Sequence, residues 1–140
     1  WASRQGLLSW YVGFFQLPAL PESIARRKLA KSLRDSGLPP EYADRYAAAM
    51  AEPGALTGAL NWYRGIPFSM RQPLERIKAP TSYIWGRHDI ALARRGVELT
   101  ADYVVGPYEV VELDAGHWLP ETEPDAVAGA ILARVWSTQG

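Results

Sequence analysis

Only two stretches of the second half of the chain have the pattern of β-strands, and each is followed by a helical pattern. We expect strands at 81–85 and 108–113, and helices at 91–105 and from 122 to about 135. The order strand, helix, strand, helix is typical of a parallel α/β unit. Parallel strands are buried on both faces and need neighbours, so two of them do not make a stable sheet. We therefore expect the chain to be the end of a larger α/β domain.

The first half of the chain has the pattern of helices separated by proline and glycine, with no convincing strand. The expected helices are 21–36, 41–50 and 55–64. Gly65 and Pro67 are expected to close the third of them. The sequence thus predicts a helical segment at 1–70, placed ahead of an α/β segment at 71–140.

Composition and charge argue against several classes of protein. The 15 Lys and Arg residues balance the 15 Asp and Glu residues, whereas a nucleic-acid-binding protein usually carries a basic excess. The absence of cysteine excludes disulfides, thiolate metal sites and a cysteine nucleophile. Two histidines and scattered carboxylates show no metal-ligand spacing. The apolar run at 7–15 is interrupted by Ser9 and Gly13 and is too short to span a bilayer, and we expect a cytoplasmic protein without membrane contact.

Two polar residues follow the ends of the two expected strands. Asp89 comes after 81–85, and His117 comes after 108–113. Ligands of a parallel sheet bind beyond the carboxyl ends of its strands, and the loops after adjacent strands meet at one edge. An Asp beside a His fixes the imidazole tautomer, so that the His can act as a base. Taken singly, Asp89 could cap a helix beginning at Ile90 and His117 could be a loop or core histidine, but their joint placement favours a catalytic pair.

Aromatic residues are frequent, with six Trp, seven Tyr and three Phe. They gather at 10–15 and 61–63. Aromatic side chains line small-molecule pockets more often than they coat surfaces, but a packed core uses them as well. Clustering alone therefore leaves a pocket and a core as equal alternatives.

Two motifs of the second half carry a family resemblance. Trp85-Gly86-x-x-Asp89 and Gly116-His117-Trp118-Leu119-Pro120 resemble the C-terminal end of α/β-hydrolases, in which the triad acid follows a late strand and the triad histidine follows the last one. The resemblance covers nearly the whole chain. It implies an α/β fold, the C-terminal part of an α/β-hydrolase, with 1–70 as the helical cap and 71–140 as the last two parallel strands and their helices.

Two further motifs, in the helical half, resemble the cap of epoxide hydrolases. They are Ser9-Trp10-Tyr11 with Phe15-Gln16-Leu17-Pro18, and Leu60-Asn61-Trp62-Tyr63-Arg64. That family carries one tyrosine in each segment, and both hydrogen-bond to or protonate the epoxide oxygen as the ring opens. The resemblance assigns this role to Tyr11 and Tyr63, with a packed aromatic core as the alternative interpretation. The apolar aromatics expected to form a hydrophobic substrate pocket are Trp10, Phe14, Phe15, Trp62 and Trp118.

The nucleophile of that family has no counterpart in this sequence. It sits on a strand-to-helix elbow ahead of the cap, and neither such an elbow nor Gly-x-Ser-x-Gly occurs here. The oxyanion hole also lies in the missing half.

The resemblance therefore implies a hydrolase that opens small apolar epoxides to diols without a cofactor. It would work with an N-terminal half supplied as a separate chain or as the other product of a cleaved precursor. The chain begins at Trp1 rather than Met, and we expect processing or a break to have removed what came before. A serine esterase on the same fold and a non-catalytic binding or scaffold protein stay open as alternatives. The identity of the missing nucleophile would distinguish them.

Overall fold

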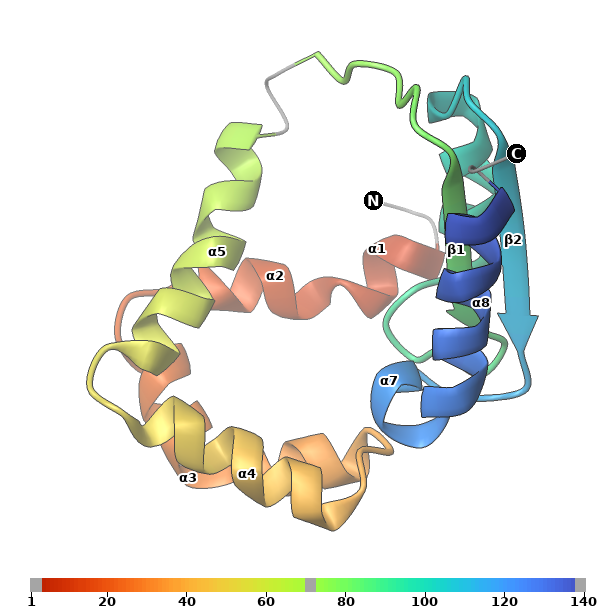
Figure 1. The fold of residues 1–140 in the computed structure, drawn as a ribbon. Helices are drawn as coiled ribbons and strands as arrows, with labels where there is room; N and C mark the ends of the chain where they lie inside the picture. Colours follow the sequence, from red (N-terminus) through yellow and green to blue (C-terminus); the bar gives the residue numbers. More distant parts are fainter. Residues whose placement is uncertain (1–3, 70–72, 138–140) are drawn as a thin grey trace. The chain divides into compact units, whose positions relative to one another are not determined.

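The computed structural model describes residues 4–69 and 73–137, which form two compact units (Figure 1). One unit comprises residues 9–69 together with residue 73 and is built from helices. The other comprises residues 4–8 and 74–137 and contains the sheet.

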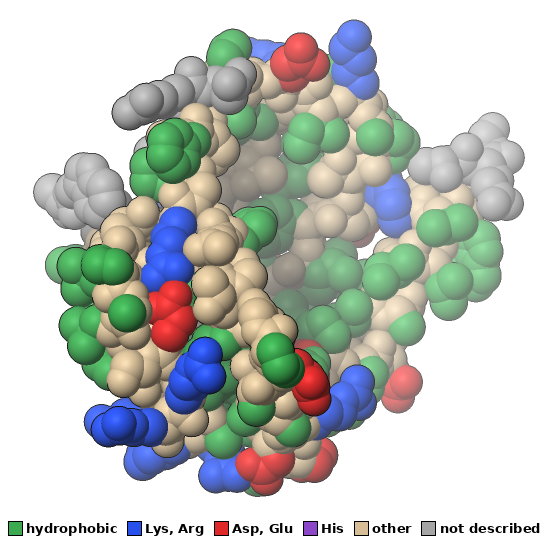
Figure 2. All heavy atoms as spheres, turned by 90° about the vertical axis from the view of Figure 1, so that its left-hand side faces the viewer, with side chains coloured by type: hydrophobic (Ala, Val, Ile, Leu, Met, Phe, Trp, Pro, Cys, Tyr) green, Lys and Arg blue, Asp and Glu red, His purple; other side chains and the backbone are tan. Residues whose placement is uncertain are grey.

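The helical unit packs around a small apolar core. Its elements are α2 (Trp10–Phe15), α3 (Leu20–Asp35), α4 (Pro40–Ala51) and α5 (Ala55–Ser69). The buried residues where α3, α4 and α5 meet are Leu38, Ala43, Leu56 and Leu60. The exposed side of α3 carries basic residues, and Figure 2 shows Lys and Arg side chains over the lower part of the view, where α3 and α4 lie. These helices are therefore amphipathic and pack through their apolar stripes.

Helices α3 and α4 lie within one residue of their expected bounds, whereas α5 runs past its expected end. Pro67 lies inside α5, although proline was expected to close it. A proline has no N–H to give to the carbonyl four residues earlier, which here belongs to Tyr63. That carbonyl accepts a hydrogen bond of 3.1 Å from Nε2 of Gln16 instead. A tertiary contact therefore satisfies the group that Pro67 leaves without its helical donor.

The second unit contains a two-stranded parallel sheet. Strand β1 (Thr81–Gly86) pairs with β2 (Tyr108–Leu113) along their full lengths, from Thr81 opposite Tyr108 to Gly86 opposite Leu113. Helix α8 (Pro124–Ser137) packs along β1 (Figure 1). The two expected strands and their parallel pairing are thus confirmed, with β1 one residue longer than expected.

Two helices cover opposite faces of this sheet. Arg134 of α8 donates hydrogen bonds to Ser82 and Glu109, which lie on one face. Arg94 of α6 (Arg94–Thr100) pairs with Glu112 and lies over the ring of Trp85 on the other face. Successive side chains of a strand point to opposite faces, so these contacts fix the layer order as helix, sheet, helix.

Two expected helices of this unit differ from the structure. The helix expected at 91–105 is replaced by α6 and a 3-10 turn, η1 (Ala101–Tyr103), because side chains hold the residues before Arg94 in an irregular loop. Thr122 is not the start of the final helix. It ends a separate short helix, α7 (Leu119–Thr122), and its hydroxyl donates to the carbonyl of Trp118. Helix α8 begins instead at Pro124, whose ring favours the first helical position.

One short helix lies with the sheet although it comes first in the chain. Helix α1 (Arg4–Leu8) belongs to the strand-bearing unit, whereas the sequence grouped it with the segment 1–70. Its Gln5 hydrogen-bonds the loop that follows β1. Within the described part of the chain, no helix is long and apolar enough to cross a membrane.

Candidate active site

The parallel sheet brings Asp89 and His117 together. Asp89 follows β1 and His117 follows β2, so that both lie beyond the carboxyl ends of the strands. Nδ1 of His117 lies 2.9 Å from Oδ2 and 3.1 Å from Oδ1 of Asp89. The hydrogen bond expected from the sequence is confirmed. Because Asp89 accepts from Nδ1, Nε2 of a neutral His117 is left with the lone pair of a base.

The backbone of the two loops is in direct contact, which explains why the side chains meet. The N–H of His88 donates to the carbonyl of Ala115 at 3.0 Å. A Cβ atom placed on Gly86 would stand far inside van der Waals contact with the carbonyl oxygen of Gly116. A residue without a side chain is therefore required where β1 ends.

Asp89 is the more buried member of the pair. Its side chain is 5% exposed, against 32% for His117. Oδ1 of Asp89 also accepts hydrogen bonds from the N–H groups of Ala91 at 2.7 Å and Leu92 at 2.8 Å. Asp89 thus bonds the following backbone, as a capping residue does, and orients the imidazole at the same time. Because no helix begins at Ile90, Asp89 caps no helix there and instead binds the backbone of the irregular loop at 90–93.

The ring of Trp118 stands beside His117, and the negative charge of Asp89 acts on the phenol of Tyr83. The ring of Trp118 stands edge-on to His117, with 5.2 Å between centroids. On β1, burial raises the pKa of the Tyr83 phenol, and the negative charge of Asp89 and the neighbouring Tyr108 raise it further. Tyr83 therefore stays a neutral phenol at physiological pH. In the described ranges, no three His, Asp or Glu side chains gather as metal ligands.

A second group of residues comes together in the helical unit. The rings of Tyr11 on α2 and Tyr63 on α5 meet edge to face, with 5.8 Å between centroids and an interplanar angle of 80°. Phe15 packs against both, at 5.5 Å from Tyr11 and 5.1 Å from Tyr63. Aromatic pairs favour this geometry, which adds to their burial. The two tyrosines expected from the resemblance are thus neighbours.

Arg64 on α5 forms hydrogen bonds with the end of α2 and the segment that follows it. Its guanidinium donates to the carbonyls of Phe15 at 2.9 Å and Leu17 at 3.0 Å. It also donates to both carboxylate oxygens of Glu22, at 2.7 Å and 3.1 Å. Hydrogen bonding from Arg64 lowers the pKa of Glu22, and Glu22 in turn raises the pKa of Arg64. The residue that follows Tyr63 therefore fixes the end of the helix that carries Tyr11.

Gln16 makes a second link between the same segments. Its Nε2 donates to the carbonyl of Val12 on α2 and to that of Tyr63 on α5, both at 3.1 Å. In the sequence, Gln16 and Arg64 stand out only as parts of the two motifs that resemble an epoxide hydrolase cap. The usable signal was Pro67, whose position four residues after Tyr63 implies a carbonyl in need of another donor.

The expected pocket residues lie in different places. Trp10 and Trp62 are 68% and 70% exposed, whereas Phe14 and Phe15 are half-buried among the aromatic rings. Trp118 lies beside His117 in the other unit. The helical unit has a cavity of about 330 Å³ between α3, α4 and α5, lined by residues outside this set. A substrate pocket formed by the five aromatics, and the action of Tyr11 and Tyr63 on an epoxide oxygen, stay predictions.

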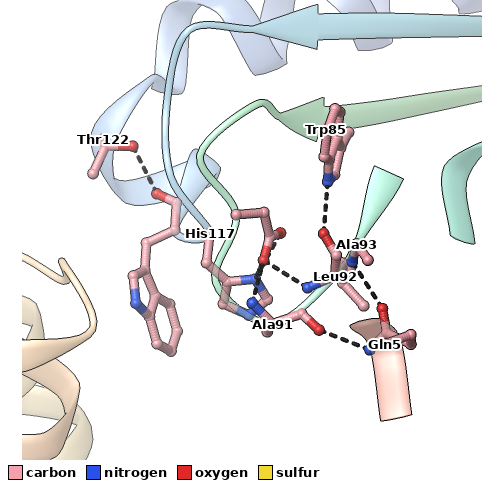
Figure 3. Close-up of polar contacts among 9 residues, drawn as sticks. Gln5, Trp85, Ala91, Leu92, Ala93, His117 and Thr122 are labelled. Carbon is pink, nitrogen blue, oxygen red and sulfur yellow. Dashed lines mark hydrogen bonds and ion pairs between the residues drawn. The ribbon is translucent and has the colours of Figure 1, made fainter. Parts of the chain in front are cut away.

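Figure 3 shows the loop after β1, which carries Asp89, held from several sides. Gln5 reaches it from α1 and bonds Ala91 and Ala93, while the indole N–H of Trp85 donates to the carbonyl of Leu92 at 3.1 Å. Nothing in the sequence pointed to Gln5.

Similarity to known proteins supports the family assignment. No protein-family model matches the chain. It is 33% identical over 137 residues to the AB hydrolase superfamily protein YfhM of Bacillus subtilis, an alignment that covers 91% of this chain and 48% of that protein. It is 33% identical over 134 residues to epoxide hydrolase 4 of Mus musculus, covering 86% of this chain and 37% of that protein. The chain therefore spans about half or less of the length of these relatives.

Solved structures show the same fold. A Bacillus megaterium epoxide hydrolase in complex with an inhibitor superimposes with a TM-score of 0.76 at 22% identity, covering 96% of this chain and 53% of that one. A structure described among novel epoxide hydrolases in metagenomes from hot environments has a TM-score of 0.70 at 26% identity, covering 94% and 51%. The chain therefore belongs to the α/β-hydrolases as a C-terminal part of that fold, and it is similar in sequence to epoxide hydrolases.

Proposed function

We propose that this chain supplies the acid–base pair and the oxygen-activating tyrosines of an epoxide hydrolase. The hydrogen bond between Asp89 and His117, at the ends of two adjacent parallel strands, is the observation that carries the proposal. The pairing of Tyr11 with Tyr63 supports epoxides as the substrate class. The aromatic residues around these tyrosines favour a small apolar substrate.

In the first step, an aspartate outside this chain attacks an epoxide carbon. The new carbon–oxygen bond makes an alkyl ester, and the carbon–oxygen bond of the ring breaks toward the epoxide oxygen. An alkoxide is a poor leaving group without a donor. Tyr11 and Tyr63 provide phenolic O–H donors there, and one of them passes its proton to the oxygen.

In the second step, Nε2 of His117 takes a proton from water as the water oxygen attacks the ester carbonyl. Asp89 stabilises the imidazolium that forms. The ester bond then breaks and the remaining proton of the attacking water passes to the leaving alkoxide oxygen, which releases the diol and restores the aspartate. The proton held by His117 returns through solvent to the tyrosine that gave one up. No step of this scheme calls for a cofactor.

We also propose that the nucleophile belongs to an N-terminal half of the same fold, on a separate or cleaved chain. Apolar side chains on the sheet and on α8 are exposed, among them Val110, Ile131 and Trp136. Parallel strands are covered on both faces and flanked by other strands in stable sheets. An N-terminal half that adds strands would bury this surface, and we expect the chain to be inactive without it.

The test compares an aryl epoxide with the matching simple ester, using the chain together with its N-terminal half. Formation of the diol without ester cleavage is the expected result, and the chain by itself should form no diol. Efficient ester cleavage with no epoxide turnover would instead favour a serine esterase, in which the same His–Asp pair serves a serine. Binding of the epoxide without turnover of either substrate would favour a non-catalytic protein.

A further inference from the structure

We infer that Gln5 is a positioning residue for the Asp89–His117 pair, which it reaches through the backbone of the loop that carries Asp89. The inference rests on the proposed function of that pair. Gln5 lies on α1 and is distant in sequence from the loop that it holds, yet both belong to the strand-bearing unit. Gln5 is half-buried.

Both ends of the Gln5 amide are used. Nε2 donates to the carbonyl of Ala91 at 2.9 Å, and Oε1 accepts from the N–H of Ala93 at 2.7 Å. Figure 3 shows this side chain reaching the loop from α1. The two hydrogen bonds hold the residues on either side of Leu92 to α1. A side chain without both a donor and an acceptor cannot reproduce this contact.

The same short loop is held by side chains at each of its central peptide groups. Asp89 accepts from the N–H groups of Ala91 and Leu92, and Trp85 donates to the carbonyl of Leu92. Gln5 supplies the partners of the Ala91 carbonyl and the Ala93 N–H. The loop conformation therefore comes from side chains rather than from a helix or a strand.

This arrangement couples Gln5 to the carboxylate of Asp89. The N–H of Ala91 binds Asp89 while the carbonyl of the same residue binds Gln5. Loss of Gln5 leaves two partly buried peptide groups without these partners, and this favours a movement of the loop that brings them to other partners. Such a movement carries the donors of Asp89 with it and turns the carboxylate away from Nδ1 of His117. A displacement of about 1 Å at a catalytic group can cost on the order of 100-fold in rate.

A purely structural role is the competing explanation, in which Gln5 only fastens α1 to the sheet unit. Gln5→Met removes both amide groups but keeps a similar length and helix propensity. Comparison of this variant with a control variant distinguishes the positioning role from the purely structural role. Arg134→Met is the matched control, since it removes hydrogen bonds from α8 to Ser82 and Glu109 in the same unit without touching the loop. Gln5→Glu keeps an acceptor for the Ala93 N–H and loses the donor to the Ala91 carbonyl.

The first readout is the NMR signal of the proton on Nδ1 of His117, which moves far downfield and exchanges slowly while a carboxylate holds it. The sequence has two histidines, and His88→Gln removes the other one for assignment. We expect the signal in the parent and in Arg134→Met, weakened in Gln5→Glu and lost in Gln5→Met. This readout does not depend on the substrate, so it decides the role of Gln5 even if the protein turns over no epoxide.

The second readout separates the two chemical steps, using the chain together with its N-terminal half. Gln5→Met should form the alkyl ester at the parental rate and hydrolyse it about 10- to 100-fold more slowly. Parental hydrolysis with an unchanged His117 signal in Gln5→Met would overturn the inference. Equal losses in Gln5→Met and Arg134→Met would show a structural role only. If Gln5→Met does not fold, Gln5→Glu decides by the same criteria.

Discussion

At the scale of single residues, Asp89 determines which nitrogen of His117 carries the proton. In Asp89→Asn the amide oxygen can still accept from Ala91 and Leu92, so folding should be preserved. The amide NH₂ can donate to Nδ1, which favours the wrong imidazole tautomer. We expect kcat to fall on the order of 10⁴-fold with little change in Tm. Steady-state kinetics and thermal unfolding of the same preparation measure both effects.

Asp114→Asn provides the control for that substitution. Asp114 accepts from His88 at 2.9 Å, but both side chains are exposed and lie outside the proposed pair. Exposed ion pairs contribute little. This variant should keep the parental kcat, and equal losses in both variants would remove Asp89 from the mechanism.

Tyr63 offers the corresponding test in the helical unit. Tyr63→Phe keeps the ring that packs on Tyr11 and Phe15 and removes only the hydroxyl. Loss of one donor to the developing alkoxide should slow epoxide opening by about 10²–10³-fold while Tm changes little. Tyr42→Phe, in the Tyr42–Tyr46 pair of α4, is the matched control and should behave as the parent. Parental epoxide turnover by Tyr63→Phe would exclude this hydroxyl from the reaction.

The site residues that could be predicted from the sequence differ from the others in what determines their partners. Asp89 and His117 each follow a strand, and the pairing of adjacent parallel strands brings such positions together. Gln5, Gln16 and Arg64 act on peptide groups that are remote in sequence. No local pattern records such a partner, because hydrogen bonds of this kind depend on how elements pack.

At the scale of elements, the end of β1 depends on the absence of a side chain at Gly86. In Gly86→Ala the new methyl group would meet the backbone oxygens of Ala115 and Gly116 in the loop after β2. Backbone atoms cannot rotate away as a side chain can. We expect a loss of about 1–3 kcal/mol in the free energy of unfolding, together with loss of the His117–Asp89 contact. Urea unfolding at neutral pH measures the first effect.

Gly129→Ala should raise the free energy of unfolding, which is the opposite of the effect expected for Gly86→Ala. Gly129 lies inside α8, and an added Cβ there meets nothing within 4 Å. Alanine in a helix interior stabilises by about 0.5–1 kcal/mol relative to glycine. If both substitutions stabilised the unit, the close approach of the two loops would be wrong.

The link between Arg64 and Glu22 makes the helical unit sensitive to acid. Hydrogen bonding from Arg64 lowers the pKa of Glu22 in the folded state below its ordinary value of 4.5. A depressed carboxylate pKa contributes stability that is present above the unfolded value and is lost as pH falls through the folded value. The parent should therefore melt at a higher temperature than Glu22→Gln at pH 7. The difference should shrink as the pH falls below about 4.5, and a difference that stays constant as the solution is acidified would contradict this account.

The elements themselves were predictable where local signals were strong. Prolines and Gly37 mark the ends of α3 and α4, and the valine content marks β2. Pro67 in α5 and the irregular loop before α6 could not be predicted, because a side chain of another segment stabilises each of them.

At the scale of the whole molecule, the number of strands was the most informative feature of the sequence. Two parallel strands with a helix on each face fit the end of a larger sheet, and the comparisons place the chain in that fold. The order of Asp89 before His117 agrees with the order of triad residues in α/β-hydrolases. The substrate could not be read from the fold, since one fold supports many reactions.

The two proposed steps can be separated most directly by following the covalent ester in a rapid-quench experiment. The polypeptide that carries the nucleophile is weighed by mass spectrometry after mixing with an epoxide. With Asp89→Asn, the ester should form at the parental rate and accumulate, because its hydrolysis needs the His117 base. With Tyr63→Phe, the ester should form more slowly and not accumulate. Absence of an epoxide-derived ester in the parent and in Asp89→Asn, with diol still being produced, would contradict the mechanism proposed for this chain.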